Sequence, residues 1–195
     1  MAQIRAFIAI EIPAEIKIHL KVLQDQIKPA GIKSVKWVEP ANLHLTLKFL
    51  GNISPSQIQP VITAMQSAVQ FSHSFHLQID SLGAFPDLNR VQVIWSGLKG
   101  ELDTLLKLQK SLDDQLARVG FVAEKRPFSA HLTLGRMREN ATLFDRQNLG
   151  KKIRSCNPGS SPLFKVSTLH LMQSQLLPSG PIYTPLESIV LPEAT

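Results

Sequence analysis

The sequence predicts an α+β fold with much antiparallel strand pairing. Segments with the two-residue alternation of strands outnumber the amphipathic helical segments, which fall in the gaps between them. No strand leads into a glycine-rich turn and a helix, so neither a dinucleotide-binding fold nor a P-loop is indicated. The chain has 195 residues, 44% of them hydrophobic and 18% charged, so we expect one domain over residues 1–195.

Alternating apolar residues predict the strands. Residues 4–12 place Ile4, Ile8 and Ile12 on one face and Phe7 on the other. A turn at residues 83–86 is expected to join two strands of the second quarter of the chain. The further predicted strands cover residues 37–38, 43–50, 75–82, 91–97, 121–124, 130–137, 164–173 and 182–190.

Four segments carry the signals of helices. Pro13 opens the first, which residues 29–31 end, and Ser54 with Pro55 opens the second, which runs to about Val69. The third covers residues 102–119 and ends at Gly120, and a short fourth helix lies around residues 142–149. The side chains expected to face inward are Ile16, Leu20, Leu23 and Ile27 in the first helix and Leu102, Leu105, Leu106, Leu112 and Leu116 in the third.

Charge and cysteine content limit the function classes. The 21 Lys and Arg residues against 15 Asp and Glu residues give a formal charge of +6, which suits a polyanionic partner such as nucleic acid. Cys156 is the single cysteine and excludes an intramolecular disulfide. The apolar run at residues 6–10 is too short for a membrane span or a signal peptide. A cytoplasmic protein without membrane association is therefore expected, and a monomer is expected because the sequence has no heptad pattern or repeat array.

One tetrapeptide occurs twice, once in each half of the chain. His44-Leu45-Thr46-Leu47 recurs as His131-Leu132-Thr133-Leu134, and both copies lie in predicted strands. Strand alternation turns each histidine and threonine to one face and both leucines to the other. Each copy therefore presents an imidazole beside a hydroxyl.

Two such motifs facing each other across a groove could cleave a phosphodiester without a metal. One imidazole would take a proton from water and the other would donate a proton to the leaving oxygen, which is work that contributes about 10²–10⁴-fold per group. The threonine hydroxyls could donate hydrogen bonds to phosphate oxygens. The alternative is an internal duplication whose histidines only pack or form hydrogen bonds.

The paired motifs resemble the signature of the two-histidine phosphoesterase superfamily. Flanking segments are similar to the RNA 2′,3′-cyclic phosphodiesterases, also called 2′-5′ RNA ligases, from about residue 3 to about residue 190. Ala130 departs from the proline that this family often has before the second histidine, which removes a backbone restraint but no functional group. The similar segments are residues 5–13, 37–43, 48–51 and 83–86, Arg90-Val91 with Trp95, and residues 126–128.

The resemblance implies a fold and a reaction. Two pseudo-symmetric lobes of antiparallel sheet with outer helices would surround a central cleft lined by one motif from each lobe. The family hydrolyses an RNA terminal 2′,3′-cyclic phosphate to a 2′-phosphate, so His44 is expected as proton donor to O3′ and His131 as proton acceptor from water. Thr46 and Thr133 would bind the phosphate oxygens, with no cofactor and no metal. The sequence by itself does not fix which histidine is the acid.

Four further side chains are candidates for the groove. Arg136 lies five residues after His131 and points away from it on a regular strand, unless a bulge or the strand end turns it inward. The resemblance implies that it binds phosphate; the alternative is a solvated arginine. Arg126 is a second substrate-binding candidate, with a plain loop arginine as the alternative. Lys48 shares the His44 face by alternation, and Phe7 could stack on a base or belong to the core.

The expected partner is RNA with a 2′,3′-cyclic phosphate end, such as the halves of a cleaved tRNA. The same groups could join that end to a 5′-hydroxyl in the reverse reaction. Two alternatives stay open from the sequence. The first is the same chemistry on a small cyclic nucleotide or a 2′-5′ oligonucleotide, and the second is a non-catalytic protein that binds RNA ends.

Overall fold

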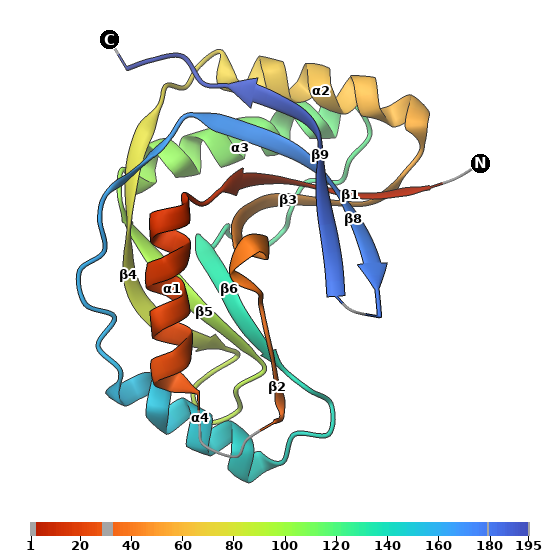
Figure 1. Ribbon diagram of the computed structural model, residues 1–195. Helices are drawn as coiled ribbons and strands as arrows, with labels where there is room; N and C mark the ends of the chain where they lie inside the picture. Colours follow the sequence, from red (N-terminus) through yellow and green to blue (C-terminus); the bar gives the residue numbers. More distant parts are fainter. Residues whose placement is uncertain (1–2, 29–32, 179, 195) are drawn as a thin grey trace.

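The computed structural model describes residues 3–28, 33–178 and 180–194 (Figure 1). Strands and helices alternate through most of these residues, and the antiparallel pairing of the described strands makes the fold α+β. The elements are β1 (Ile4–Glu11), α1 (Ala14–Ile27), β2 (Val35–Trp37), the 3-10 turn η1 (Pro40–Asn42), β3 (His44–Ile53), α2 (Pro55–Val69), β4 (Phe75–Phe85), β5 (Val93–Gly100), α3 (Leu102–Arg118), β6 (His131–Met137), α4 (Leu143–Ser155), β7 (Phe164–Val166), β8 (Thr168–Leu177) and β9 (Gly180–Val190).

The described strands form one antiparallel sheet in the order β7-β4-β5-β6-β3-β1-β8-β9, and β2 pairs with β6 beside this path. Four strands of this path lie on each side of the β6–β3 junction, where Leu45 is paired with Leu132. Each motif strand thus lies at the inner edge of its own half. The predicted pseudo-symmetric α+β fold is confirmed, with the two half-sheets joined into one.

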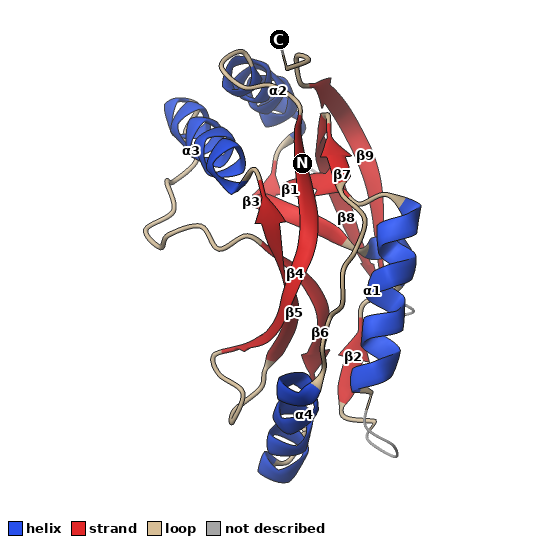
Figure 2. Cartoon of the chain, turned by 90° about the vertical axis from the view of Figure 1, so that its left-hand side faces the viewer, coloured by secondary structure: helices blue, strands red, loops and turns tan. Residues whose placement is uncertain are grey.

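The helices lie in two pairs outside the sheet, α2 beside α3 at one end of the molecule and α1 beside α4 at the other (Figure 2). Helix α1 follows β1 of the first half, yet its Gln24 Nε2 donates to the Leu134 carbonyl of β6 at 2.8 Å. Helix α3 follows β5 of the second half, yet its Asp113 pairs with Lys48 of β3. Each motif strand is therefore supported by a helix from the other half.

The structure confirms several local predictions. Helix α2 has the predicted bounds, and Ser54 and Gln57 form a capping box at its start. The apolar stripe predicted for α1 is buried, and Gly120 has the positive φ of +96° that ends α3. Residues 29–31, predicted to end α1, lie outside the described residues. No helix in the described part of the chain is long and apolar enough to span a membrane.

The turn predicted at residues 83–86 is wrong, because Gly83 to Phe85 continue β4 and the connection to β5 follows them. Gly83 is required here by close packing, since a Cβ atom at this position would overlap the Trp95 ring. The carboxylate of Asp87 then accepts hydrogen bonds from the Asn89 and Arg90 amides in the real connection.

Other boundaries also differ from the predictions. Leu106 is 42% exposed, and Leu108 is buried in its place, because the core-facing stripe of α3 follows the three- and four-residue spacing from Leu105. Residues 121–124 form no strand, and helix α4 extends to Ser155. The single strand predicted at 164–173 is two strands, β7 paired with β4 and β8 paired with β1, which places them in different halves.

Candidate active site

Each motif strand carries a β-bulge at the last leucine of its motif. On β3, Thr46 is paired with Ala9 and Lys48 with Ile8, so Leu47 is the extra residue. On β6, Thr133 is paired with Trp95 and Gly135 with Ile94, so Leu134 is the extra residue. A bulge shifts the alternation of side chains by one position. In both strands, two consecutive residues consequently face the core.

The bulges decide which side chains share the histidine face. Arg136, five residues after His131, points to the same face as this histidine and is exposed. The bulge turns it there, which is one of the two ways that the sequence allowed. Phe49 is its counterpart five residues after His44, and it is 65% exposed. Phe49 is paired with Phe7, and Arg136 with Val93. Phe49 was not among the predicted site residues. The signal that could have found it is its place five residues after His44, which matches the place of Arg136 after His131.

Lys48 does not face the groove, so the prediction for this residue is wrong. The bulge at Leu47 turns Lys48 to the core side, where it is 4% exposed. Its ammonium group pairs with Asp113 of α3 and donates to the Val122 carbonyl at 2.7 Å. The other Asp113 carboxylate oxygen accepts from the Glu124 amide at 3.1 Å. Lys48 therefore ties β3 to α3 and to the loop that leads towards the second motif.

The two imidazoles are held in the same way. His44 Nδ1 lies 2.7 Å from the Asn42 carbonyl, and His131 Nδ1 lies 2.7 Å from the Ser129 carbonyl. A carbonyl can only accept a hydrogen bond, so Nδ1 carries the hydrogen in both rings. Each Nε2 is left to accept a proton when the ring is neutral or to donate one when it is charged.

The pairing of Leu45 with Leu132 sets the two motifs side by side. One position to either side, antiparallel register brings His44 across from Thr133 and His131 across from Thr46, all on one face. Residues related diagonally in this way, as the two histidines are, generally have Cα atoms about 7–8 Å apart, so their side chains can reach a common ligand.

Aromatic rings pack around both histidines, most closely around His44. The centroid of the Phe7 ring lies 4.8 Å from that of His44, and the Tyr183 ring lies 5.1 Å away, edge-on. Phe85 lies edge-on to His131 at 5.1 Å. Phe7 is only 4% exposed, so stacking of a base on it requires a neighbour to move, whereas Phe49 already offers a free face.

Burial lowers the pKa of His44, and the Lys17 charge lowers it further, against the hydrogen bond to Asn42 and the charge of Glu11. Burial raises the pKa of Tyr183, while the charges of Arg136 and Arg5 oppose that rise. Tyr183 has no counterpart in the sequence predictions, because its strand β9 is far from both motifs along the chain.

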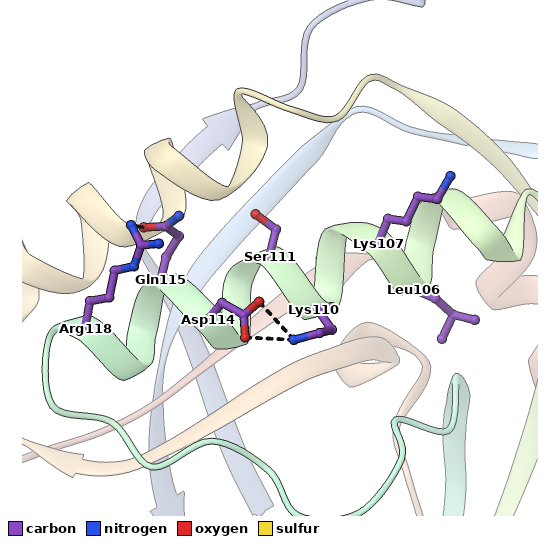
Figure 3. A pocket seen from close by; sticks show the side chains of 7 residues that line it. All are labelled: Leu106, Lys107, Lys110, Ser111, Asp114, Gln115 and Arg118. Atoms are coloured by element: carbon purple, nitrogen blue, oxygen red, sulfur yellow. Dashed lines mark hydrogen bonds and ion pairs between the residues drawn. The ribbon is translucent and has the colours of Figure 1, made fainter.

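Arg126 lies in the exposed loop between α3 and β6. Within the described ranges it makes no ion pair and no side-chain hydrogen bond, and its role in binding substrate stays a prediction. A shallow hollow elsewhere, on the solvent face of α3, contains Lys107 and the Lys110–Asp114 ion pair but neither motif (Figure 3). Among residues that the structure describes, no three His, Cys, Asp or Glu side chains gather as metal ligands.

Comparisons with known proteins give the same internal repeat. A sequence profile of the family described as LigT like Phosphoesterase matches residues 10–95 and, a second time, residues 98–183. Each matched stretch contains one copy of the motif. The profile therefore matches each motif-bearing half of the chain separately.

Individual relatives match over nearly their whole length. The chain is 32% identical to the RNA 2′,3′-cyclic phosphodiesterase of Methanothermobacter thermautotrophicus over 185 residues, 95% of this chain and 97% of that protein. It is 34% identical to the protein of the same name from Archaeoglobus fulgidus over 183 residues, 93% of this chain and 97% of that one.

Solved structures share the fold. E. coli LigT in complex with 3′-AMP superposes with a TM-score of 0.77 at 29% identity, covering 97% of this chain and 99% of that one. Its apo form gives a TM-score of 0.75 at 27% identity, over 99% and 100% of the two chains. With two profile matches that span both motif-bearing halves, this chain belongs to the LigT-like phosphoesterase family, within the two-histidine superfamily.

Proposed function

We propose that the protein hydrolyses the 2′,3′-cyclic phosphate at the end of an RNA to a 2′-phosphate. The observation that carries the proposal is the register of the two motifs, which sets each histidine beside the threonine of the other motif. The names of the relatives, which match along nearly the whole chain, support the same substrate class.

The reaction uses both imidazoles. His131 Nε2 takes a proton from a water molecule, whose oxygen attacks phosphorus as the bond from phosphorus to O3′ breaks. His44 Nε2, in the charged ring, gives its proton to the leaving O3′. Thr46 and Thr133 donate hydrogen bonds to the non-bridging oxygens, and the Arg136 guanidinium offsets the charge that develops on them.

The lowered pKa of His44 bears on this assignment. A low pKa makes the charged imidazole a stronger acid but leaves less of it charged in the free enzyme at neutral pH. The anionic phosphodiester favours the charged form once it binds, since an opposite charge nearby raises the pKa of a histidine. The reverse assignment uses the same geometry, because both Nδ1 atoms have equivalent carbonyl partners.

The two halves supply different contacts to the substrate. Phe49 offers an exposed ring for the terminal base beside Phe7 and His44, as single-stranded RNA sites commonly do. Arg136 supplies positive charge on the opposite half, and Arg126 adds to it from the exposed loop that leads into the second motif. We place ligation of the cyclic phosphate to a 5′-hydroxyl, as between tRNA halves, in the same site as the reverse reaction.

The test is to incubate an RNA oligonucleotide that ends in a 2′,3′-cyclic phosphate with the purified protein in excess EDTA and to identify the product end. A clean 2′-phosphate is expected from wild type, and no product from His44→Ala or His131→Ala. A protein that only binds RNA ends would leave the cyclic phosphate intact. Turnover that EDTA abolishes would contradict the proposal of a reaction without a metal. The same preparation, by its sedimentation, would test the expected monomer of one bilobal domain.

A further inference from the structure

A lysine lies directly beside Arg136 on the neighbouring strand. Strand β2 is paired with the end of β6, and within this pairing Lys36 is opposite Arg136. Residues directly opposite each other in an antiparallel pair point to the same face. Lys36 is exposed, as Arg136 is.

The neighbours of Lys36 establish which face this is. Val35 and Trp37 turn towards the core, since a Cβ atom placed on the buried Gly135 would come within 3.1 Å of both side chains. Lys36, between them, therefore points to the opposite face, which carries the two histidines. The bulge at Leu134 is what aligns Arg136 with it.

Two like charges directly opposite each other destabilise a pair of strands. Neither Lys36 nor Arg136 forms an ion pair with a carboxylate in the described part of the chain, although eight other such pairs are present there. The sheet thus keeps an uncompensated pair of cations on its catalytic face. Such a pair is explained when an anion from outside the protein lies against it.

We propose that Lys36 binds the phosphodiester one nucleotide upstream of the reacting cyclic phosphate, beside Arg136. This inference rests on the proposed function. Strand β2 pairs with the same edge of β6 as β3 does, but beyond the motif, so Lys36 is level with Arg136 and three residues past Thr133, about 10 Å along the strand. That distance makes Lys36 a cation further along the groove rather than a second ligand of the reacting group. The site then favours an oligonucleotide end over a single nucleotide.

The test compares kcat/KM on two substrates, an oligoribonucleotide with a 2′,3′-cyclic phosphate end and a nucleoside 2′,3′-cyclic phosphate. For Lys36→Ala we expect about a tenfold loss on the oligonucleotide and none on the nucleotide, because only the former has an upstream phosphate. The slope of log kcat/KM against log salt should also become shallower by about 0.7 for the oligonucleotide. Lys107→Ala, which removes an exposed lysine of α3 (Figure 3), is the matched control for net charge.

Equal losses on both substrates would overturn the inference, because Lys36 would then act at the reacting phosphate. The absence of a loss on either substrate would overturn it as well. If wild type turns over neither substrate, the proposed function fails, and the subsite is tested by binding alone. Fluorescence anisotropy with a labelled, uncleavable RNA that ends in a 2′-phosphate then decides. Weaker binding by Lys36→Ala than by Lys107→Ala supports the subsite, and equal binding rejects it.

Discussion

Strands β3 and β6 have the same backbone design and different outer side chains. Both begin with the motif, bulge at its last leucine and follow the same order of buried and exposed residues over their first seven positions. At the fifth position after the histidine, the first half carries Phe49 and the second carries Arg136. The comparison teaches that the repeat supplies a shared frame of two histidines and two threonines, while divergence just beyond the bulge makes one side aromatic and the other cationic.

The supports behind the two bulges also differ. Behind β6, the Gln24 amide donates to the carbonyls of Leu134 and Val38, both at 2.8 Å. Behind β3, the support is the ion pair between Lys48 and Asp113. Gly135 occupies the position in β6 that Lys48 occupies in β3. Because it has no side chain, Trp37 and Val35 pack against it. The Gln24 amide thus supports β6, which carries Arg136. The buried ion pair between Lys48 and Asp113 supports β3, which carries Phe49.

The largest expected effect comes from removing what the halves share. His44→Ala and His131→Ala should each lower kcat by about 10²–10⁴-fold, because each removes one proton-transfer group. The double variant should be little slower than either single variant, since the two groups act as one unit. Single-turnover rates measure this, with His76→Ala at the far edge of the sheet as control. Activity in either variant close to that of the control would reject the shared frame.

The two supports should differ in their contribution to stability. Lys48→Met leaves the Asp113 carboxylate with no cation in a nearly closed site, so we expect the free energy of unfolding to fall by about 3–5 kcal/mol. Gln24→Leu leaves the Leu134 carbonyl its bond from the Val38 amide and should cost about 1–3 kcal/mol. Urea unfolding measures both. Lys48→Met with Asp113→Leu should recover most of the loss, and failure to recover would mean that the ion pair is not the support.

The two side chains beyond the bulges, Arg136 and Phe49, should affect different kinetic constants. Arg136→Ala should lower kcat by about 10²-fold, because its charge is needed most in the transition state. Phe49→Ala should raise KM by about tenfold with little change in kcat, since stacking holds the base in ground and transition state alike. Steady-state kinetics distinguishes the two patterns, and Arg136→Lys should restore part of the rate. If both variants changed only KM, the proposed division between base side and phosphate side would fail.

The smallest effect concerns the pKa of His44. Burial lowers this pKa, so an NMR titration should find His44 protonating below the ordinary 6.5. Unfolding then takes up a proton, so stability should be complete above the unfolded pKa and fall as pH drops through 6.5 towards the folded pKa. Tyr183→Ala admits water to the ring and should move the pKa upward, whereas Tyr183→Phe should not. An unchanged pKa of His44 in Tyr183→Ala would show that Tyr183 does not bury His44.

The sequence predicted the parts of the site that repeat and missed those that depend on the fold. His44, Thr46, His131 and Thr133 were identified because one short motif occurs twice. A bulge has no signature in a run of apolar residues, so the face of Lys48 could not be read from alternation. Pairing between strands distant in the chain brings Tyr183 to His44, and no local pattern encodes such pairing.

The division of labour between the halves can be tested most directly with a cyclic substrate that has sulfur in place of O3′. A thiolate leaves without needing a proton, so the loss of the general acid matters little on this substrate. We expect His44→Ala to recover to near the wild-type rate on the thio substrate, while His131→Ala stays slow because water still needs a base. Recovery of His131→Ala instead, with His44→Ala slow, would contradict the assignment of the acid to the first half and the base to the second.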